Sequence, residues 1–360
     1  MNDKLFSSVI LLGWLILVLA NCATSKDAVA NTSFFSADHA LLRYTGRIDF
    51  SDLRLPKFYQ PASYIEAAFK GKSCGIIVED QQLWGNQNYL EIVIDGVEYR
   101  RQTKTARDTL FFDNLGNGPH QLQVYKNTEA NIGWVAIAGL ICKKLVPLPA
   151  EPKRKMEFIG NSITCGASAD ASEIPCHTAK WHDQHRAYSS YASVTARNLE
   201  ASWHLSSVSG IGLIRSCCEM DVLMPPVYDN IDMRGDSLDW DFANYQPDVV
   251  SICLGQNDGI QDSVAFCSAY VSFIQTIRSH HPQAQIICLT SPMADDHLTK
   301  TLQNYLRGIV AAVNEKGDQK VTKFFFSKSY TGGCDTHPSV EEHALIAAEL
   351  TPFLRQLMGW

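Results

Sequence analysis

What this chain lacks already excludes several classes of protein. It carries a net charge of −7 over 360 residues and has no block of Lys and Arg, so a nucleic-acid partner is not expected. It has no C-x-x-C pair and no H-E-x-x-H string, so a zinc site has no support, and we predict neither a metal nor a cofactor. Charged residues are scarce, at 19% against 46% hydrophobic residues. This composition favours well-buried cores over long disordered segments.

The apolar run near the N-terminus is too short for a membrane span. Residues 9–20 fall below the roughly 20 residues that a transmembrane helix needs, but they fit the apolar region of a signal peptide. Leu19-Ala20-Asn21-Cys22 resembles the lipobox of bacterial lipoproteins, in which the cysteine is lipidated. The alternative is an ordinary signal peptide with a chance cysteine. We predict a signal peptide over 1–22, a polar tether over 23–38, and export to the bacterial cell surface or periplasm, with membrane contact only through a lipid anchor on Cys22.

Ten further cysteines occur in the chain. An even number in an exported protein permits disulfides, but several of these residues lie inside apolar runs, where a free cysteine packs as a small hydrophobic side chain. We therefore expect few bridges.

Residues 39–148 have the pattern of an all-β domain. Leu90, Ile92 and Ile94 occupy alternate positions, and Asp95-Gly96 then gives the turn signal of a hairpin. Short runs of the same kind recur, separated by turn residues. They predict an antiparallel β-sandwich of the jelly-roll type. Other candidate strands are 64–69, 75–78, 109–112 and 134–141.

A proline-rich linker at 147–152 precedes a second domain over 153–360, in which strands and helices alternate. This alternation predicts an α/β fold with a parallel sheet between helices on both faces. The expected strands are 156–159, 203–208, 249–254, 286–290 and 321–326, and the expected helices are 187–199, 263–279, 297–314 and 339–357.

Three polar strings follow strands of this second domain. They are Gly160-Asn161-Ser162, Gly255-Gln256-Asn257-Asp258 and Cys334-Asp335-Thr336-His337-Pro338. The carboxyl ends of parallel strands meet at the edge of the sheet where ligands bind in such folds. A serine, an asparagine and a histidine gathered there predict a hydrolase site.

The residue types suit acyl transfer. Ser162 needs a base to take its proton, and His337 lies in a loop that suits that role. A tetrahedral intermediate also needs donors for its oxyanion, and we expect the backbone N–H groups of Ser162 and Gly210 and the side-chain amide of Asn257 to supply them.

The surrounding residues resemble a known family. The Gly-x-Ser-x-Gly elbow of α/β-hydrolases is absent, because Thr164 occupies the place of its second glycine. The blocks at Ser162, Gly210, Asn257 and His337 match those of the SGNH hydrolases, also called GDSL esterases, in the same order. Longer strings resemble carbohydrate esterase family 2: 126–129, 159–166, 209–212, 240–242, 254–258 and 333–338.

The resemblance implies a jelly-roll β-sandwich followed by a flavodoxin-like, three-layer SGNH domain. It also implies a serine esterase that removes acetyl groups, through an acyl-enzyme, from acetylated plant cell-wall polysaccharides such as xylan and mannan, or from oligosaccharides. Two other readings stay open. One is a carbohydrate-binding surface lipoprotein with a silent second domain, and the other is an SGNH esterase that acts on lipids or thioesters.

The chain departs from the SGNH pattern at two places. Asn161 replaces the aspartate before the nucleophile, which keeps the hydrogen bonds of a turn and removes a charge. Cys334 stands where the triad aspartate is usual, and Asp335 is one place too close to His337. We therefore expect a backbone carbonyl near Cys334 to orient the imidazole in a Ser-His dyad, with Asp335 and Cys334 as auxiliary candidates.

Several other residues have simpler interpretations. We expect Asp258 to cap the segment that follows it, His343 to be structural, and Asp295-Asp296-His297 to begin a helix. Three tryptophans could stack on a sugar ring or pack in the core, namely Trp181, Trp203 and Trp240. Core packing is the safer prediction for each of them.

Overall fold

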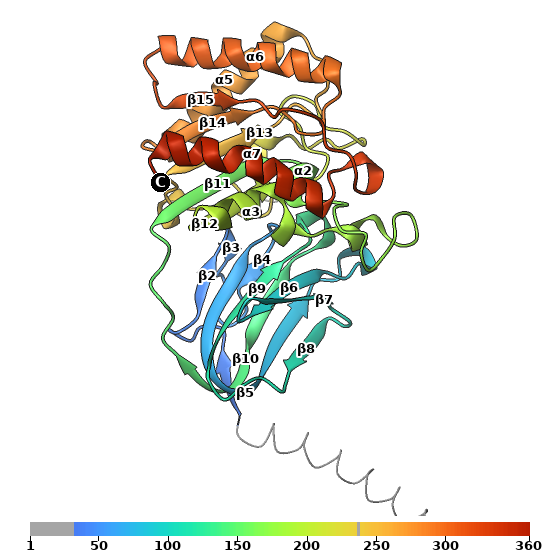
Figure 1. The fold of residues 1–360 in the computed structure, drawn as a ribbon, viewed down its shortest axis with the longest axis vertical. Coiled ribbons are helices and arrows are strands. Elements are labelled where there is room, and N and C mark those ends of the chain that lie inside the picture. Colours follow the sequence, from blue (N-terminus) through green and yellow to red (C-terminus); the bar gives the residue numbers. More distant parts are fainter. Residues whose placement is uncertain (1–31, 236–237) are drawn as a thin grey trace, which may run out of the picture.

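The computed structural model describes residues 32–235 and 238–360, which form an antiparallel β domain followed by an α/β domain (Figure 1). The predicted signal peptide, Cys22 and most of the predicted tether lie outside these residues. In the described part of the chain, no helix is long and apolar enough to cross a membrane.

The antiparallel domain is one highly curved sheet with the order β3-β4-β10-β5-β9-β6-β7, in which β1 pairs with β10 and both β2 and β8 pair with β5. Alternate side chains such as Ile65, Ile76 and Val124 point into its core. The strands are β1 (Ser33–Ser36), β2 (Arg43–Thr45), β3 (Ile48–Asp49), β4 (Lys57–Phe58), β5 (Tyr64–Asp80), β6 (Tyr89–Ile94), β7 (Val97–Gln102), β8 (Arg107–Phe112), β9 (Pro119–Lys126) and β10 (Val135–Val146).

The predicted hairpin is present between β6 and β7, and its turn residues Asp95 and Gly96 both have positive φ, as a two-residue turn of this kind requires. Two expectations were wrong. Residues 33–36 are not tether but form β1, because they pair with Gly139–Cys142 of β10. The two strands expected over 64–78 are one strand, because β10 pairs with β5 on both sides of the polar stretch between them.

The α/β domain holds a parallel sheet with the order β12-β11-β13-β14-β15. In chain order this is 2-1-3-4-5, the flavodoxin-like arrangement. Val250 and Ile252 of β13 pack on the side of α5 and α6, whereas Val249 and Cys253 pack on the side of α3 and α7. The strands are β11 (Arg154–Gly160), β12 (Ala201–Ser207), β13 (Val249–Cys253), β14 (Gln285–Leu289) and β15 (Val321–Phe324).

Helices cover both faces of this sheet, as the alternation predicts (Figure 1). The helix expected over 187–199 begins later, because the Ser190 side chain accepts the N–H of Ser193 and caps α3. The helices are α2 (Ser162–Cys165), α3 (Tyr191–Asn198), α4 (Met224–Val227), α5 (Ser263–His280), α6 (Asp296–Glu315) and α7 (Val340–Met358). Short 3₁₀ turns lie at Leu83–Gly85, Ala130–Ile132, Trp181–Gln184, Ala187–Ser189, Phe242–Asn244 and Cys334–Thr336.

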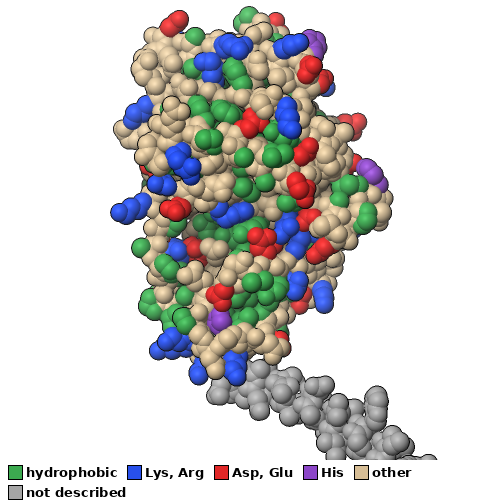
Figure 2. All heavy atoms as spheres, viewed as in Figure 1, with side chains coloured by type: hydrophobic (Ala, Val, Ile, Leu, Met, Phe, Trp, Pro, Cys, Tyr) green, Lys and Arg blue, Asp and Glu red, His purple; other side chains and the backbone are tan. Residues whose placement is uncertain are grey.

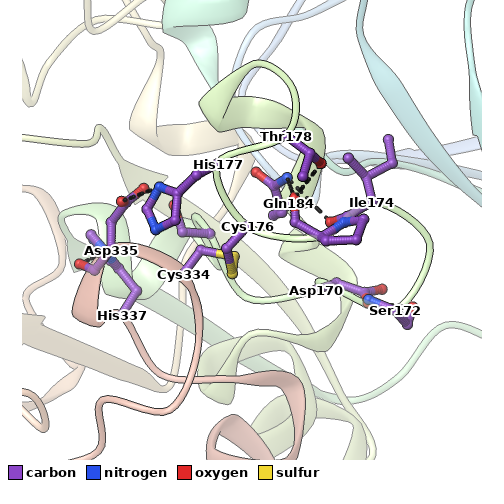
Figure 3. The surroundings of a disulfide bond; sticks show 12 residues. Asp170, Ser172, Ile174, Cys176, His177, Thr178, Gln184, Cys334, Asp335 and His337 are labelled. Carbon is purple, nitrogen blue, oxygen red and sulfur yellow. Dashed lines mark hydrogen bonds and ion pairs between the residues drawn. A yellow bond between two sulfur atoms is a disulfide. The ribbon is translucent and has the colours of Figure 1, made fainter.

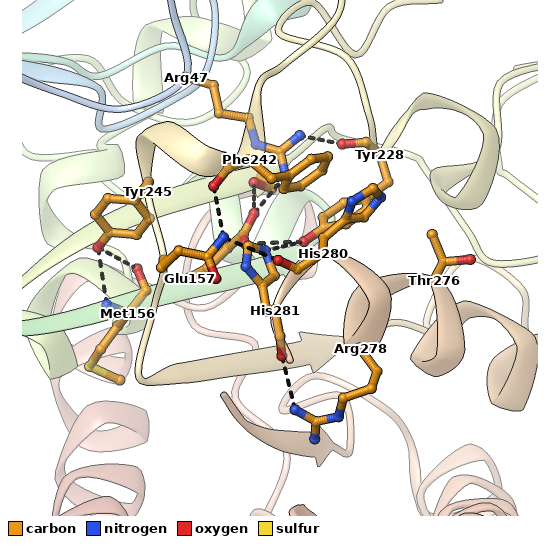
Figure 4. Close-up of polar contacts among 12 residues, drawn as sticks. Arg47, Met156, Glu157, Tyr228, Phe242, Tyr245, Thr276, Arg278, His280 and His281 are labelled. Carbon is orange, nitrogen blue, oxygen red and sulfur yellow. Dashed lines mark hydrogen bonds and ion pairs between the residues drawn. The ribbon is translucent and has the colours of Figure 1, made fainter. Parts of the chain in front are cut away.

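A buried ion pair joins the two domains (Figure 4). Arg47 enters from the antiparallel domain, and its Nη2 lies 2.8 Å from Oε1 of Glu157 on β11, with both side chains almost fully buried. Glu157 Oε2 also lies 3.2 Å from Nε2 of His281 and accepts the hydroxyl of Tyr228 at 3.1 Å. Burial by itself raises the pKa of Glu157, but the charges of Arg47 and His281 outweigh it and hold the pKa well below its usual value. The carboxylate is therefore ionised and fixes how the domains meet.

The molecular surface carries charges of both signs. On the face drawn in Figure 2, Lys and Arg side chains are interspersed with Asp and Glu rather than gathered in a stripe.

Candidate active site

The register of the parallel sheet brings three loops to one edge. Gly160 at the end of β11 lies level with Ser207 at the end of β12 and with Cys253 at the end of β13. Each strand is followed within a few residues by a predicted site residue, namely Ser162, Gly210 and Asn257. Neighbouring strands that end together necessarily bring the loops after them together.

Ser162 and His337 are in hydrogen-bond contact although they are far apart in the sequence. The Oγ of Ser162 lies 2.8 Å from Nε2 of His337. Ser162 is the first residue of α2, and Asn161 is the cap of that helix, because its side chain accepts the N–H of Ile163 at 3.2 Å. The residue that replaces the family's aspartate thus performs the capping, which leaves the Ser162 hydroxyl free for the imidazole.

The imidazole is oriented by a backbone carbonyl, as expected for a dyad. Nδ1 of His337 lies 3.1 Å from the carbonyl oxygen of Asp335. A carbonyl can only accept, so Nδ1 carries the proton and the lone pair of Nε2 faces Ser162. Asp335 and Thr336 have φ of +51° and +59°, which folds the loop back and lets this carbonyl reach the ring. The carboxylate of Asp335 instead lies 3.6 Å from Nδ1 of exposed His177 (Figure 3).

His337 is held neutral by its surroundings. Burial lowers the pKa of His337 below its ordinary 6.5, and nearby His185 acts in the same direction, against the opposing effect of the Asp335 carbonyl. A neutral imidazole is the form that a general base requires.

Cys334 acts on this loop through a covalent bond, so it has no thiol to act as an auxiliary group. It forms a disulfide with Cys176, which ties the loop before His337 to the excursion between α2 and α3 (Figure 3). Within the described part of the chain this is the one bridge, which agrees with the expectation of few disulfides. The cysteines that remain free there are Cys74, Cys142, Cys165, Cys217, Cys218, Cys253, Cys267 and Cys288.

The loop that carries Gly210 is fixed by its neighbours. Gly210 has a φ of +82°, a left-handed conformation that favours glycine, and a Cβ at this position would also lie 2.7 Å from Sδ of Met220. The carbonyl of Gly210 accepts the N–H of Cys217 at 2.9 Å. The amide nitrogen of Asn257 donates to the carbonyl of Ile211 at 2.8 Å, which leaves its second N–H for another acceptor.

Asp258 has a different role from the one expected. It does not cap the segment after it, because its buried carboxylate accepts the N–H groups of Leu213, Ile214 and Arg215 at 2.7–3.1 Å. Sequence reasoning missed this contact because those amides lie on another loop. Asp258 and Asn257 together hold the chain after Gly210.

The remaining predictions concern residues outside the reacting groups. Asp295 begins α6 by accepting the N–H of Leu298, and buried His343 accepts the N–H of Tyr191 at 3.1 Å, so both are structural as expected. Trp203 is buried between the domains, Trp240 is partly buried, and Trp181 is 44% exposed.

One buried carboxylate beside the site was not expected. Glu129, from the antiparallel domain, accepts the N–H of Ser209 next to Gly210. The only signal in the sequence is that it ends the family-like string Lys126-Asn127-Thr128-Glu129.

Two family models match the chain. The model described as carbohydrate esterase 2 N-terminal matches residues 44–152, and the GDSL-like lipase/acylhydrolase family matches residues 158–323. A curated relative, the cellulase/esterase CelE of Acetivibrio thermocellus, is 33% identical over 90% of this chain, which spans only 40% of that protein. An acetylxylan esterase/glucomannan deacetylase of Cellvibrio japonicus is 28% identical over 95% of this chain and 96% of its own length.

Solved structures agree with these matches. A family two carbohydrate esterase from Cellvibrio japonicus has a TM-score of 0.83 and 26% identity, covering 91% of this chain and 98% of that one. One from Clostridium thermocellum, in complex with cellohexaose, has a TM-score of 0.81 and 32% identity, covering 89% of this chain and 99% of that one. With this identity over almost the whole of a solved member, and with both domains matched, the chain belongs to the family two carbohydrate esterases.

Proposed function

We propose that this protein is a serine esterase that removes acetyl groups from acetylated plant cell-wall polysaccharides or their oligosaccharides. The observation that carries the proposal is the 2.8 Å contact between the Ser162 hydroxyl and Nε2 of an imidazole whose Nδ1 faces a carbonyl. A relative of nearly equal length is named for acetylxylan and glucomannan, which supports this substrate class.

The proposed reaction uses these groups in order. His337 Nε2 takes the proton of Ser162 as the hydroxyl oxygen attacks the acetyl carbonyl, and the Asp335 carbonyl stabilises the imidazolium that forms. The N–H groups of Ser162 and Gly210 and the second amide N–H of Asn257 bind the oxyanion. The tetrahedral intermediate expels the sugar hydroxyl, which takes its proton from His337. Water then attacks the acyl-enzyme by the same route and releases acetate.

Acetate release from acetylated xylan and glucomannan, by the wild type and by Ser162→Ala, tests this proposal. The wild type is expected to release acetate and Ser162→Ala to lose the activity. A silent carbohydrate-binding domain would give no release from either protein. An inactive wild type, or an active Ser162→Ala, would overturn the proposal.

A series of p-nitrophenyl esters separates the acetyl esterase from a lipid hydrolase, and an acyl thioester assayed beside it tests for a thioester hydrolase. We expect the acetyl ester to be the best substrate and the rate to fall as the acyl chain lengthens. A rate that rises with chain length would assign the protein to lipid substrates instead.

We also propose that the antiparallel domain, which begins with β1 and so covers 33–148, is a jelly-roll sandwich, and that the hydrolase domain is 153–360. The pairing of β5 with β8, β9 and β10 supports the jelly-roll assignment. Export and lipidation of Cys22 belong to the same proposal, and rest on the sequence of the first 22 residues. Incorporation of labelled fatty acid into the wild type, but not into Cys22→Ala, is the expected result.

A further inference from the structure

The antiparallel domain places one carboxylate against the loop that carries Gly210. Glu129 follows β9, and its side chain is completely buried. One oxygen, Oε2, accepts the backbone N–H of Ser209 and also lies 3.6 Å from Sγ of Cys165. Ser209 directly precedes Gly210, whose N–H is a proposed oxyanion donor. The N–H of Ser209, one residue before Gly210, therefore has its acceptor on the antiparallel domain.

The segment that presents Glu129 is itself held by buried contacts. The Lys126 amine donates to the carbonyls of Thr128 at 2.6 Å and Glu129 at 2.8 Å. The Asn127 amide donates to Glu91 at 2.8 Å and its oxygen accepts the N–H of Tyr188 at 3.1 Å. Every residue of the string 126–129 is completely buried, so close packing restricts where the carboxylate can lie.

The other oxygen of Glu129 faces a histidine of the hydrolase domain. Oε1 lies 3.6 Å from Nε2 of His185, both side chains are completely buried, and neither atom has a hydrogen-bond partner among residues 32–235 and 238–360. The Nδ1 of His185 accepts the N–H of Ser168 at 3.3 Å, so Nε2 carries a proton directed towards the carboxylate. The proton on Nε2 and the lone pairs of Oε1 are thus complementary groups that face each other.

The chain of contacts continues to the histidine of the proposed dyad. The carbonyl of Ser168 accepts the N–H of Cys334 at 2.9 Å, and the carbonyl of Cys334 accepts the N–H of His337 at 3.0 Å. Glu129 therefore lies between the two loops that must be aligned, with Gly210 on one side and His337 on the other.

The charge of Glu129 suits this position. Burial raises the pKa of Glu129, but the contact with His185 and the N–H of Ser209 outweigh it and hold the pKa below its ordinary value, so the group is ionised. A charged acceptor makes a stronger hydrogen bond to a backbone N–H than a neutral one does. The Nε2–H of His185 faces the second carboxylate oxygen, and the Lys126 amine lies on the same segment, where it donates to the Glu129 carbonyl.

We propose that Glu129 is a positioning residue: through Ser209 it holds the Gly210 N–H in the oxyanion hole, and through His185 and Ser168 it supports the loop of His337. The antiparallel domain then completes the esterase site rather than only carrying it. This inference rests on the proposed esterase function.

The test compares Glu129→Gln and Glu129→Ala with the control Glu66→Gln. Glu66 is a largely buried carboxylate of the same domain, and its partners Arg43 and Gln123 also belong to that domain. On p-nitrophenyl acetate we expect kcat to fall about tenfold in Glu129→Gln, which can keep only one of the two contacts, and about a hundredfold in Glu129→Ala, because the latter loses the support of an oxyanion donor. KM should stay within about twofold, as should both constants of Glu66→Gln.

A double variant separates positioning from general damage. In the Glu129→Ala background the oxyanion hole is already misaligned, so adding Asn257→Ala should reduce kcat by a smaller factor than it does in the wild type. Additive losses would mean that Glu129 does not act on the hole and would overturn the inference.

Other outcomes are equally decisive. Folded Glu129 variants with kcat within twofold of the wild type, or with a loss confined to KM, would overturn the inference while leaving the esterase function intact. If thermal unfolding shows that Glu129→Ala does not fold, Glu129→Gln alone decides, by its kcat. A wild type without activity would instead reject the esterase function itself.

Discussion

Glu157 and Glu129 are both carboxylates buried where the two domains meet, but they are satisfied to different degrees. Glu157, within β11, receives Arg47 at 2.8 Å, Tyr228 at 3.1 Å and His281 at 3.2 Å. Glu129 has a close bond only to Ser209, and its second oxygen stands 3.6 Å from His185. The first contact lies inside the sheet, and the second lies beyond the strand ends, where the site is.

The comparison indicates that two buried carboxylates in the same domain interface can have different roles. Glu157, which is fully paired and lies within a strand, stabilises the contact between the two domains. By the proposal above, a carboxylate that holds the N–H of Ser209, next to Gly210, sets the alignment of reacting groups. Breaking the first should cost folding free energy with little effect on chemistry, and breaking the second should do the reverse.

The largest expected effect that tests this contrast is on stability. Arg47→Met removes the guanidinium but leaves Glu157 buried, and loss of one partner of such a pair typically costs about 3–5 kcal/mol. The ring contacts of Arg47 with Tyr228 and Phe242, at 4.6 and 4.9 Å, are lost as well. Urea unfolding measures the change in the free energy of unfolding, and the kcat of the folded fraction should remain within about twofold.

Arg54→Met is the matched control, because Arg54 is 82% exposed and lies 3.9 Å from Asp38, so little change is expected. The contrast fails if Arg47→Met is as stable as this control, or if it keeps full stability and loses kcat.

A second effect should appear in catalysis alone. Asn257→Ala removes a proposed oxyanion donor, for which the typical loss is about 10²–10³ in kcat. It also removes the contact with the Ile211 carbonyl, so thermal unfolding is measured in parallel. Gln256→Ala is the neighbouring control, since Gln256 accepts only from the hydroxyl of Ser291 among the described contacts. Equal losses in the two variants, or a loss in KM only, would argue against an oxyanion role for Asn257.

The pH dependence of the reaction is a third test. Because the pKa of His337 lies below 6.5, the base stays neutral at lower pH than an ordinary histidine, and the acid limb of kcat/KM should have its midpoint below pH 6.5. An acid limb centred above pH 6.5 would contradict the neutral, half-buried base.

Stability must be followed over the same range. Burial lowers the pKa values of His204 and His343 to about 3 in the folded protein, whereas both titrate near 6.5 when unfolded. The unfolded state therefore binds more protons as the pH falls from 6.5 towards 3, and the free energy of unfolding decreases. Circular dichroism at each pH separates this loss from titration of the base.

Much of the fold and the central contact of the site could be predicted from the sequence, because both depend on strand order and register. Polar strings placed directly after apolar runs must meet at one sheet edge, and Ser162 and His337 do. Glu129 could not be found in this way, because its proposed role depends on how the two domains contact each other. The contact of Asp258 with residues 213–215 depends likewise on a loop path that has no periodic signal.

The smallest expected effect concerns Asp335, and it decides between a dyad and a triad. The backbone carbonyl of Asp335 orients His337, and its carboxylate faces His177 near the solvent. Asp335→Asn removes the charge, keeps the carbonyl and tolerates the left-handed φ of +51°. We therefore expect kcat to stay within about threefold of the wild type. When the aspartate of a true triad is replaced by asparagine, kcat falls by about 10⁴, so a loss on that scale would show that the carboxylate turns towards the imidazole during the reaction. His177→Ala tests whether a fall in kcat comes from the carboxylate or from its contact with His177. If kcat falls equally in both variants, the His177–Asp335 contact holds the loop in which His337 lies.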